Sequence, residues 1–253
     1  MKASRRDATI AAAQFVAKHR DVEANVRRHV RLASLAADHG ARMVVFPELS
    51  LTSYDLALTV SDALTPDDSR LRPLAELAHA RDLILVAGAP IAVDDSLYIG
   101  AIAFRREGRP TTYLKQYPTI KEQRTFMPGP SGVTIAFADD IVGLAICADV
   151  GHAEHARDAA NRGATIYAAG SLVSGDGYAA DTMLLQRYAT DHSMLTLLAN
   201  YGAPTGGYTA AGRSAAWSDK GKLLATAPPN GDALVVARRA GSEWTATAFA
   251  CPE

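Results

Sequence analysis

Short apolar runs alternate with amphipathic segments along most of the chain, and this alternation restricts the fold more than any other feature of the sequence. Residues 9–15 form a first apolar run. Residues 21–39 then repeat apolar side chains at helical spacing up to Gly40, and residues 42–46 form a compact second run. Because strands that alternate with helices are typical of α/β proteins, this pattern predicts sheets covered by helices.

The rest of the chain continues this pattern and adds hairpins. Turn-rich residues 106–110 join two expected strands, and Asp139-Asp140 joins two more. Hairpins and helical connections together predict mixed sheets. The large number of short strands favours two sheets over one. The sequence shows no linker and no internal repeat, so a single domain is expected over residues 1–253. Further helices are expected at 73–80, 153–162 and 179–192, and further strands at 83–87, 97–104, 111–114, 133–137, 141–146, 165–169, 194–199, 213–217, 222–226 and 234–237.

Charge and hydropathy argue against several classes of protein. The chain carries 26 Lys+Arg against 27 Asp+Glu in 253 residues, which is not the basic footprint of a nucleic-acid-binding protein. No stretch approaches the ~20 apolar residues that a membrane helix requires. Arg5-Arg6 resembles the start of a twin-arginine export signal, but the apolar run that follows is short and is broken by Gln14. We therefore expect a cytoplasmic protein that acts on a small molecule and binds neither nucleic acid nor membranes.

Three reactive side chains stand at the carboxyl ends of apolar runs. They are Glu48, Lys115 and Cys147. Taken singly, each has an ordinary explanation: a solvated loop carboxylate, a lysine on an edge strand, and a small buried side chain. Ligands of open α/β sheets bind outside the carboxyl ends of the strands, however, so the three side chains can converge on one pocket.

Together the three side chains form a complete set for nucleophilic catalysis. A free thiol, with a pKa of about 8.5, is only a few per cent thiolate at neutral pH and needs a base. A carboxylate in a closed pocket can have its pKa raised toward that role, and a fixed ammonium can stabilise an oxyanion. The second cysteine, Cys251, is expected to be a small buried apolar side chain.

The segments around these residues resemble the motifs of the nitrilase, or carbon–nitrogen hydrolase, superfamily. Residues 44–54 are similar to its glutamate motif, residues 113–122 with 126–129 to its lysine motif, and residues 143–149 to its cysteine motif. Their order and separations also match. The resemblance implies a four-layer α-β-β-α sandwich with two mixed β-sheets, whose subunits form a homodimer or a higher homo-oligomer.

The resemblance also implies roles for particular residues. Glu48 matches the general base, Lys115 the oxyanion donor and Cys147 the nucleophile. Glu122 matches a second glutamate, which orients the lysine or the hydrolytic water. The backbone N–H of Ala148 would be the second oxyanion donor.

Substrate choice is less constrained by the sequence. Tyr54, Ser171 and Leu172 are the candidates for shaping the substrate site. Cys147 is followed by Ala-Asp, whereas true nitrilases of the superfamily tend to show Trp-Glu there, so an amide is favoured over a nitrile. After Asp149 the chain lacks the Arg and Pro that are usual in the family.

No metal or cofactor is expected. His152, Glu154 and His155 do not follow the spacing of zinc-protease or zinc-deaminase motifs, and the glycines of residues 170–177 do not form a phosphate-binding loop. The sequence therefore predicts a cysteine-dependent amidase that hydrolyses a small amide or N-carbamoyl compound through a thioester. The alternatives are a nitrilase, an acyltransferase that transfers the same acyl group to an amine, and a non-catalytic scaffold of the same fold.

Overall fold

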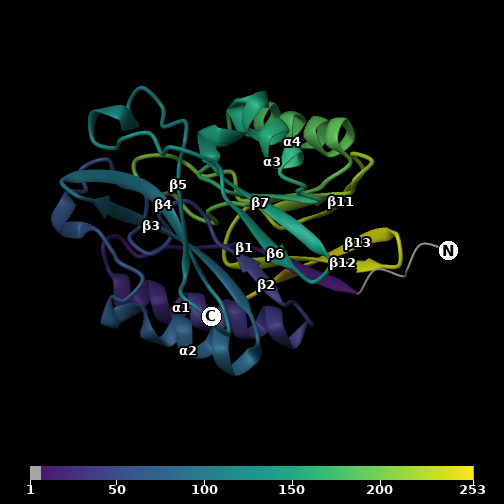
Figure 1. The fold of residues 1–253 in the computed structure, drawn as a ribbon, viewed down its shortest axis with the longest axis horizontal. Helices are drawn as coiled ribbons and strands as arrows, with labels where there is room; N and C mark the ends of the chain where they lie inside the picture. The colour runs from purple at the N-terminus through teal and green to yellow at the C-terminus, as the bar shows by residue number, and fades with distance from the viewer. Residues whose placement is uncertain (1–6, 253) are drawn as a thin grey trace.

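Two β-sheets pack face to face, and helices cover the outer face of each (Figure 1). The computed structural model describes residues 7–252, so Arg5 and Arg6 lie outside the described residues. The first sheet contains β1 (Ala8–Gln14), β2 (Met43–Val45), β3 (Ile84–Val93), β4 (Ser96–Phe104), β5 (Thr111–Leu114), β12 (Ala233–Ala240) and β13 (Glu243–Ala250). The second contains β6 (Thr134–Phe137), β7 (Asp140–Ile146), β8 (Ile166–Gly170), β9 (Leu195–Ala199), β10 (Ala215–Trp217) and β11 (Leu223–Thr226).

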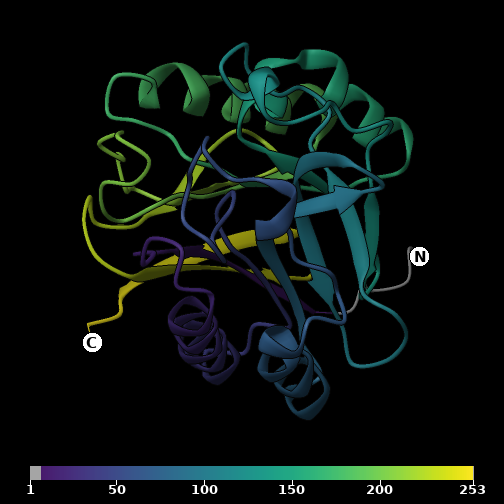
Figure 2. The ribbon, with the colours of Figure 1, turned by 90° about the vertical axis from the view of Figure 1, so that its left-hand side faces the viewer.

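The helices form the two outer layers. In Figure 2, α1 and α2 lie on one side of the sheets, and α3 and α4 lie on the other. The predicted α-β-β-α sandwich is thus confirmed. The α-helices are α1 (Val22–Asp38), α2 (Arg72–Arg81), α3 (Ala153–Asn161) and α4 (Tyr178–His192), and the short 3-10 helices are η1 (Val60–Asp62), η2 (Ser69–Leu71), η3 (Glu122–Arg124) and η4 (Cys147–Gly151).

Local sequence explains where α1 begins and which face it buries. The side chain of Asp21 caps the helix by accepting a hydrogen bond of 3.0 Å from the Ala24 N–H. Its apolar positions, such as Val26 and Leu32, are buried. The chain then turns at Gly40, whose φ of +84° is a left-handed conformation that glycine adopts without strain.

Both sheets are mixed, as predicted. In the first, β1, β2 and β3 are parallel, while β3, β4 and β5 form antiparallel pairs. In the second, β7, β8 and β9 are parallel, while β6 pairs with β7 in the antiparallel sense. Every residue of β1, β8 and β9 is buried, which suits strands covered on both faces.

The last strands differ from the expectation. The strand predicted at 234–237 is longer in the structure, where it forms β12. The sequence analysis predicts no strand at the position of β13. In β13, Thr and Ala alternate without a strong apolar pattern, and much of the strand is exposed. It is held by pairing with β12 along all eight residues, a backbone interaction that depends little on side chains.

The described part of the chain offers no candidate for a membrane-crossing helix. None of the helices within residues 7–252 combines the required length with the required apolar character.

Candidate active site

The structure brings Glu48, Lys115 and Cys147 together between the two sheets. Glu48 lies three residues beyond β2, and Lys115 directly follows β5, so both come from the first sheet. Cys147 directly follows β7 in the second sheet and lines the same cavity as Glu48. The ends of strands far apart in the sequence therefore supply an acid, an amine and a thiol to one place.

Two glycines allow the turn that carries Glu48 to fit between the sheets. A Cβ on Gly88 of β3 or on Gly170 of β8 would collide with the backbone of residues 46–49. The turn is also held by Tyr201, whose hydroxyl donates a hydrogen bond of 2.6 Å to the carbonyl oxygen of Glu48. The position of this carboxylate thus depends on both sheets.

Lys115 is enclosed by two carboxylates. Its Nζ donates to Glu48 Oε1 at 2.6 Å and to Glu122 Oε1 and Oε2 at 2.9 and 2.8 Å. Glu122 is fixed in turn by the Tyr54 hydroxyl at 2.9 Å and by the Thr119 N–H at 2.7 Å. All three charged side chains are at most 1% exposed, so water does not screen them. Glu122 therefore positions Lys115, and Tyr54 and Thr119 position Glu122.

Burial sets the charge states of this cluster. It raises the pKa of Glu48 to about 7; the Lys115 ammonium opposes the rise and the Glu122 carboxylate adds to it. Burial acts to lower the pKa of Lys115, but the negative charges of Glu48, Cys147 and Glu122 outweigh it and raise that pKa. Lys115 is thus a permanent cation, whereas Glu48 can exchange a proton near neutral pH.

The Cys147 thiol lies close to the Glu48 carboxylate in the same cavity. Burial, with the added charge of Glu48, raises the pKa of the thiol well above its usual range, so the resting group is protonated. The nearby thiol acts to lower the pKa of Glu48, and Sγ lies 3.5 Å from the Leu172 carbonyl oxygen. Glu48 Oε1 is held by Lys115, while Oε2 is buried without a conventional hydrogen-bond partner among residues 7–252. Oε2 is therefore free to accept the thiol proton.

The backbone at Cys147 is also specialised. Its φ of +47° lies in the left-handed region, which a non-glycine residue adopts at a cost. Cys147 begins η4, and the first N–H groups of a helix have no partner within it. The N–H of Ala148 is one of these groups, which suits it for binding an oxyanion.

Asp149 ties the Cys147 turn to the segment after Lys115. Its Oδ1 accepts hydrogen bonds from the N–H groups of Gln116 and Tyr117 at 3.1 and 2.9 Å. Its Oδ2 accepts one from the Ile146 N–H at 2.9 Å. This fully buried carboxylate therefore fixes the ends of β5 and β7 relative to each other.

His155 belongs to the same buried network. The Tyr113 hydroxyl lies 2.6 Å from Asp149 Oδ2 and 2.8 Å from His155 Nε2, and the other ring nitrogen of His155 lies 2.8 Å from the Tyr167 hydroxyl. Burial lowers the pKa of His155. Within residues 7–252 no group of three or more His, Cys, Asp or Glu side chains is arranged to hold a metal ion.

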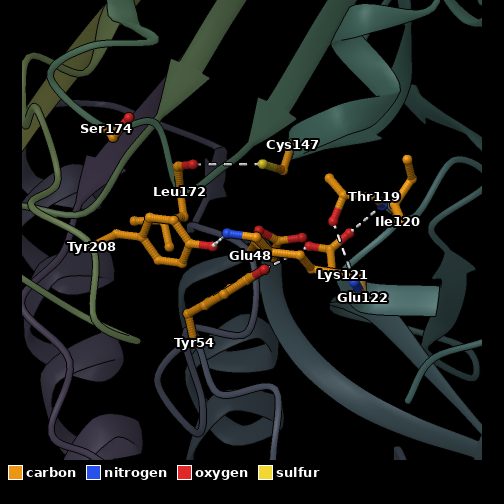
Figure 3. A pocket seen from close by; sticks show the side chains of 10 residues that line it. All are labelled: Glu48, Tyr54, Thr119, Ile120, Lys121, Glu122, Cys147, Leu172, Ser174 and Tyr208. Carbon is orange, nitrogen blue, oxygen red and sulfur yellow. Dashed lines mark hydrogen bonds between the residues drawn. The ribbon is translucent and has the colours of Figure 1, made fainter. Parts of the chain in front are cut away.

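A cavity of about 550 Å³ opens over Cys147 (Figure 3). Of the residues predicted to shape the substrate site, Tyr54 and Leu172 line it. Ser171 is buried and is not among the lining residues. Among the described residues the lining consists of Glu48, Tyr54, Thr119, Ile120, Lys121, Glu122, Cys147, Leu172, Ser174 and Tyr208.

Several of these residues were not anticipated from the sequence. Lys121 belongs to a charged run that reads as an ordinary solvated surface, and Tyr208 lies in a loop without a motif. Their proximity to Cys147 depends on how those loops fold, which sequence spacing does not reveal.

The fold and the group of acid, amine and thiol at its centre agree with the family that the sequence motifs resemble. The family model for carbon–nitrogen hydrolases matches residues 9–249, and the chain belongs to this family. The predicted superfamily is thereby confirmed.

Known proteins similar to this chain include enzymes of different size. A glutamine-dependent NAD(+) synthetase of Mycobacterium tuberculosis is 29% identical over 237 residues, covering 81% of this chain and 34% of that protein. An (R)-stereoselective amidase of a Pseudomonas species is 24% identical, covering 83% of this chain and 77% of that protein. The chain thus spans about a third of the length of the synthetase that it matches.

Solved structures share the fold. A cysteine-to-alanine mutant of the amidase from Nesterenkonia sp. AN1, in complex with butyramide, superposes with a TM-score of 0.81 at 24% identity, covering 90% of this chain and 89% of that one. Nit3 of Saccharomyces cerevisiae, a member of branch 10 of the nitrilase superfamily, has a TM-score of 0.84 at 23% identity, with 93% and 90% covered.

Proposed function

We propose that this protein hydrolyses small amides, including N-carbamoyl compounds, through a thioester on Cys147. The observation that carries the proposal is the state of Glu48. One of its oxygens is bound to Lys115, the other accepts no hydrogen bond from residues 7–252, and burial raises its pKa to about 7 in the cavity that it lines together with Cys147. A base that exchanges protons near neutral pH is what a protonated thiol needs in order to attack a carbonyl carbon.

The first half of the reaction forms the thioester. Glu48 takes the thiol proton as Sγ of Cys147 bonds to the carbonyl carbon, and the carbonyl oxygen becomes an oxyanion. Glu48 then gives its proton to the amide nitrogen, the C–N bond breaks, and ammonia or an amine leaves. In the second half, Glu48 accepts a proton from water as the water attacks the thioester. The carboxylic acid is released and the thiol recovers its proton.

The oxyanion is stabilised by Lys115 and by the Ala148 N–H. An ammonium has three N–H donors, and those of Lys115 point at Glu48 and at both oxygens of Glu122. We infer that one of the two bonds to Glu122 is exchanged for the oxyanion. Glu122 keeps its hydrogen bonds from Tyr54 and Thr119, so it stays in place during this exchange.

Similar proteins support an amide as the substrate. A second mutant of the Nesterenkonia amidase, in which a glutamate is replaced by leucine, has a TM-score of 0.80 at 24% identity over 90% of this chain and 89% of that one. It shows covalent addition of the acetamide moiety of fluoroacetamide at its active-site cysteine. The synthetases are named as glutamine-dependent, and glutamine carries a primary amide.

The proposed function is tested by intact-mass spectrometry. The protein is mixed with a panel of amides, N-carbamoyl compounds and nitriles, and the reaction is quenched in acid. We expect an amide or N-carbamoyl compound to add the mass of its acyl group, with the adduct located on Cys147. An adduct formed only with nitriles, or a product formed only when an amine acceptor such as hydroxylamine is present, would indicate a nitrilase or an acyltransferase. No adduct and no turnover with any compound would favour a non-catalytic scaffold.

The rate of acylation should depend on pH through Glu48. Because its pKa is raised to about 7, Glu48 is largely protonated at pH 6 and largely ionised at pH 8. We expect kcat/KM for a neutral amide to rise about tenfold per pH unit below pH 7 and to level off above it. Lys115 keeps its proton throughout because its pKa is raised, so it does not cause a decline. In Glu48→Gln the rise should disappear together with most of the activity. An unchanged rise in that variant would assign the titration to another group.

A further inference from the structure

Lys121 extends across the cavity from one wall toward the other (Figure 3). It precedes η3, whereas Tyr208 lies in the segment between β9 and β10. The Nζ atom of Lys121 lies 3.5 Å from the Tyr208 hydroxyl and 5.7 Å from the centre of its ring. Two segments distant in the sequence thus place an ammonium and a phenol hydroxyl at the cavity that contains Cys147.

The Lys121 ammonium contacts the hydroxyl and ring of Tyr208, but no carboxylate of the described residues neutralises it. Lys115 forms ion pairs with Glu48 and Glu122, whereas Lys121 forms no ion pair with any carboxylate of residues 7–252. Among the described residues that line the cavity, Lys121 is the one cation. The Tyr208 hydroxyl provides a second polar group at the same point.

The inner end of the cavity has the opposite charge. Glu48 and Glu122 share the single ammonium of Lys115, so this cluster has a net charge of −1 when both carboxylates are ionised. An anionic substrate would be repelled by that charge unless a cation lay near its own negative group. Lys121 is placed to supply that cation.

We propose that the substrate is an amide that carries a carboxylate at the end remote from the bond that is cleaved. This inference rests on the proposed function. The amide lies at Cys147, and the carboxylate is bound by Lys121 and the Tyr208 hydroxyl. The apolar surfaces of Leu172, Ile120 and Tyr54 lie in the same lining and suit a short chain of methylene groups between the two ends. A cavity of about 550 Å³ accommodates such a molecule.

The test compares matched substrates with wild type and Lys121→Met, which removes the charge but keeps an apolar stem. The anionic series is succinamate, glutaramate and adipamate, and the neutral series is butyramide, pentanamide and hexanamide. We expect Lys121→Met to lower kcat/KM for the best anionic amide by about 10- to 100-fold, mainly through KM, because a charged hydrogen bond is lost. For the neutral amides we expect a change within about twofold. Added salt should weaken the wild-type preference for the anionic series.

Three further variants sharpen the result. Tyr208→Phe keeps the ring, removes the hydroxyl and should reproduce part of the loss. Lys121→Glu should reverse the preference, so that 4-aminobutanamide becomes a better substrate than succinamate. Lys220→Met removes a lysine that is not among the cavity-lining residues and should behave like wild type with every substrate.

The possible outcomes separate this inference from the proposed function. If Lys121→Met changes both series by the same factor, or if wild type prefers the neutral series at every salt concentration, Lys121 is an ordinary solvated lysine and the inference is wrong. Acyl adducts of the neutral amides on Cys147 would still support the amidase function in that case. If neither series nor any N-carbamoyl compound forms an adduct or is turned over, the proposed function itself fails.

Discussion

Replacing Cys147 by alanine should leave a folded protein without measurable amide hydrolysis. The Sγ atom is the proposed nucleophile, and neighbouring groups cannot replace the bond that it forms to the substrate. The loss in kcat should be at least about 10⁴-fold, as is found when other hydrolases lose their nucleophile. Ammonia release measures the activity. Thermal unfolding should change little, because the side chain is small, only half-buried and lines an open cavity.

Cys251 provides the matched control for this variant. It is also a free thiol, but it is buried beside the end of β13 and is not among the residues lining the cavity. Cys251→Ala should keep full activity and lose a modest amount of stability, about 1 kcal/mol, as is usual for a small buried truncation. Undiminished hydrolysis by Cys147→Ala would refute the assignment of the nucleophile, whatever the behaviour of Cys251→Ala.

Replacing Lys115 by methionine should impair both catalysis and folding. Loss of an oxyanion donor typically lowers turnover roughly 100- to 1,000-fold. In addition, Glu48 and Glu122 would remain buried together without their shared cation. Removal of one partner from a buried ion pair costs about 3–5 kcal/mol, so the variant should be markedly less stable to urea.

The stability deficit of Lys115→Met should depend on pH. Without the ammonium the pKa of Glu48 rises further above its already raised value of about 7. A group whose pKa is higher in the folded than in the unfolded state stabilises the fold at low pH and loses that contribution as pH rises. The deficit relative to wild type should therefore be larger at pH 8 than at pH 6. Lys220→Met, at a lysine outside the site, should show no such difference. A deficit independent of pH would mean that the two carboxylates are not the cause.

The sequence alone indicates some residues of the site but not the contacts that these residues make. The sequence indicates Glu48, Lys115 and Cys147 as candidates because each follows an apolar run and because their chemistry is complementary, and the structure places them close together. Glu122 was found through the family resemblance, yet its partners Tyr54 and Thr119 were not foreseen. Tyr54 is predicted to contact substrate; in the structure it lines the cavity, and its hydroxyl donates a hydrogen bond to Glu122.

Other residues could not be placed from the sequence. Ser171 and Leu172 are neighbours, yet Leu172 lines the cavity and Ser171 does not, and this difference depends on how the segment after β8 packs. Asp149 belongs to the segment that resembles the cysteine motif of the family. Its hydrogen bonds to the segment after Lys115 connect the two sheets, and no nearby sequence pattern predicts them. The same holds for Tyr201, which supports Glu48 through a backbone carbonyl.

The amino-acid sequence by itself determined the alternation of strands and helices, the mixed character of the sheets and the identity of the reactive side chains. These properties follow from hydrophobic period and residue chemistry, which are local. The tertiary structure decided which oxygen of Glu48 is free, that Lys115 is held between two carboxylates, and that Lys121 faces Tyr208 across the cavity. Those relations arise where the ends of two sheets and several loops meet, and their geometry depends on contacts between residues that are distant along the chain.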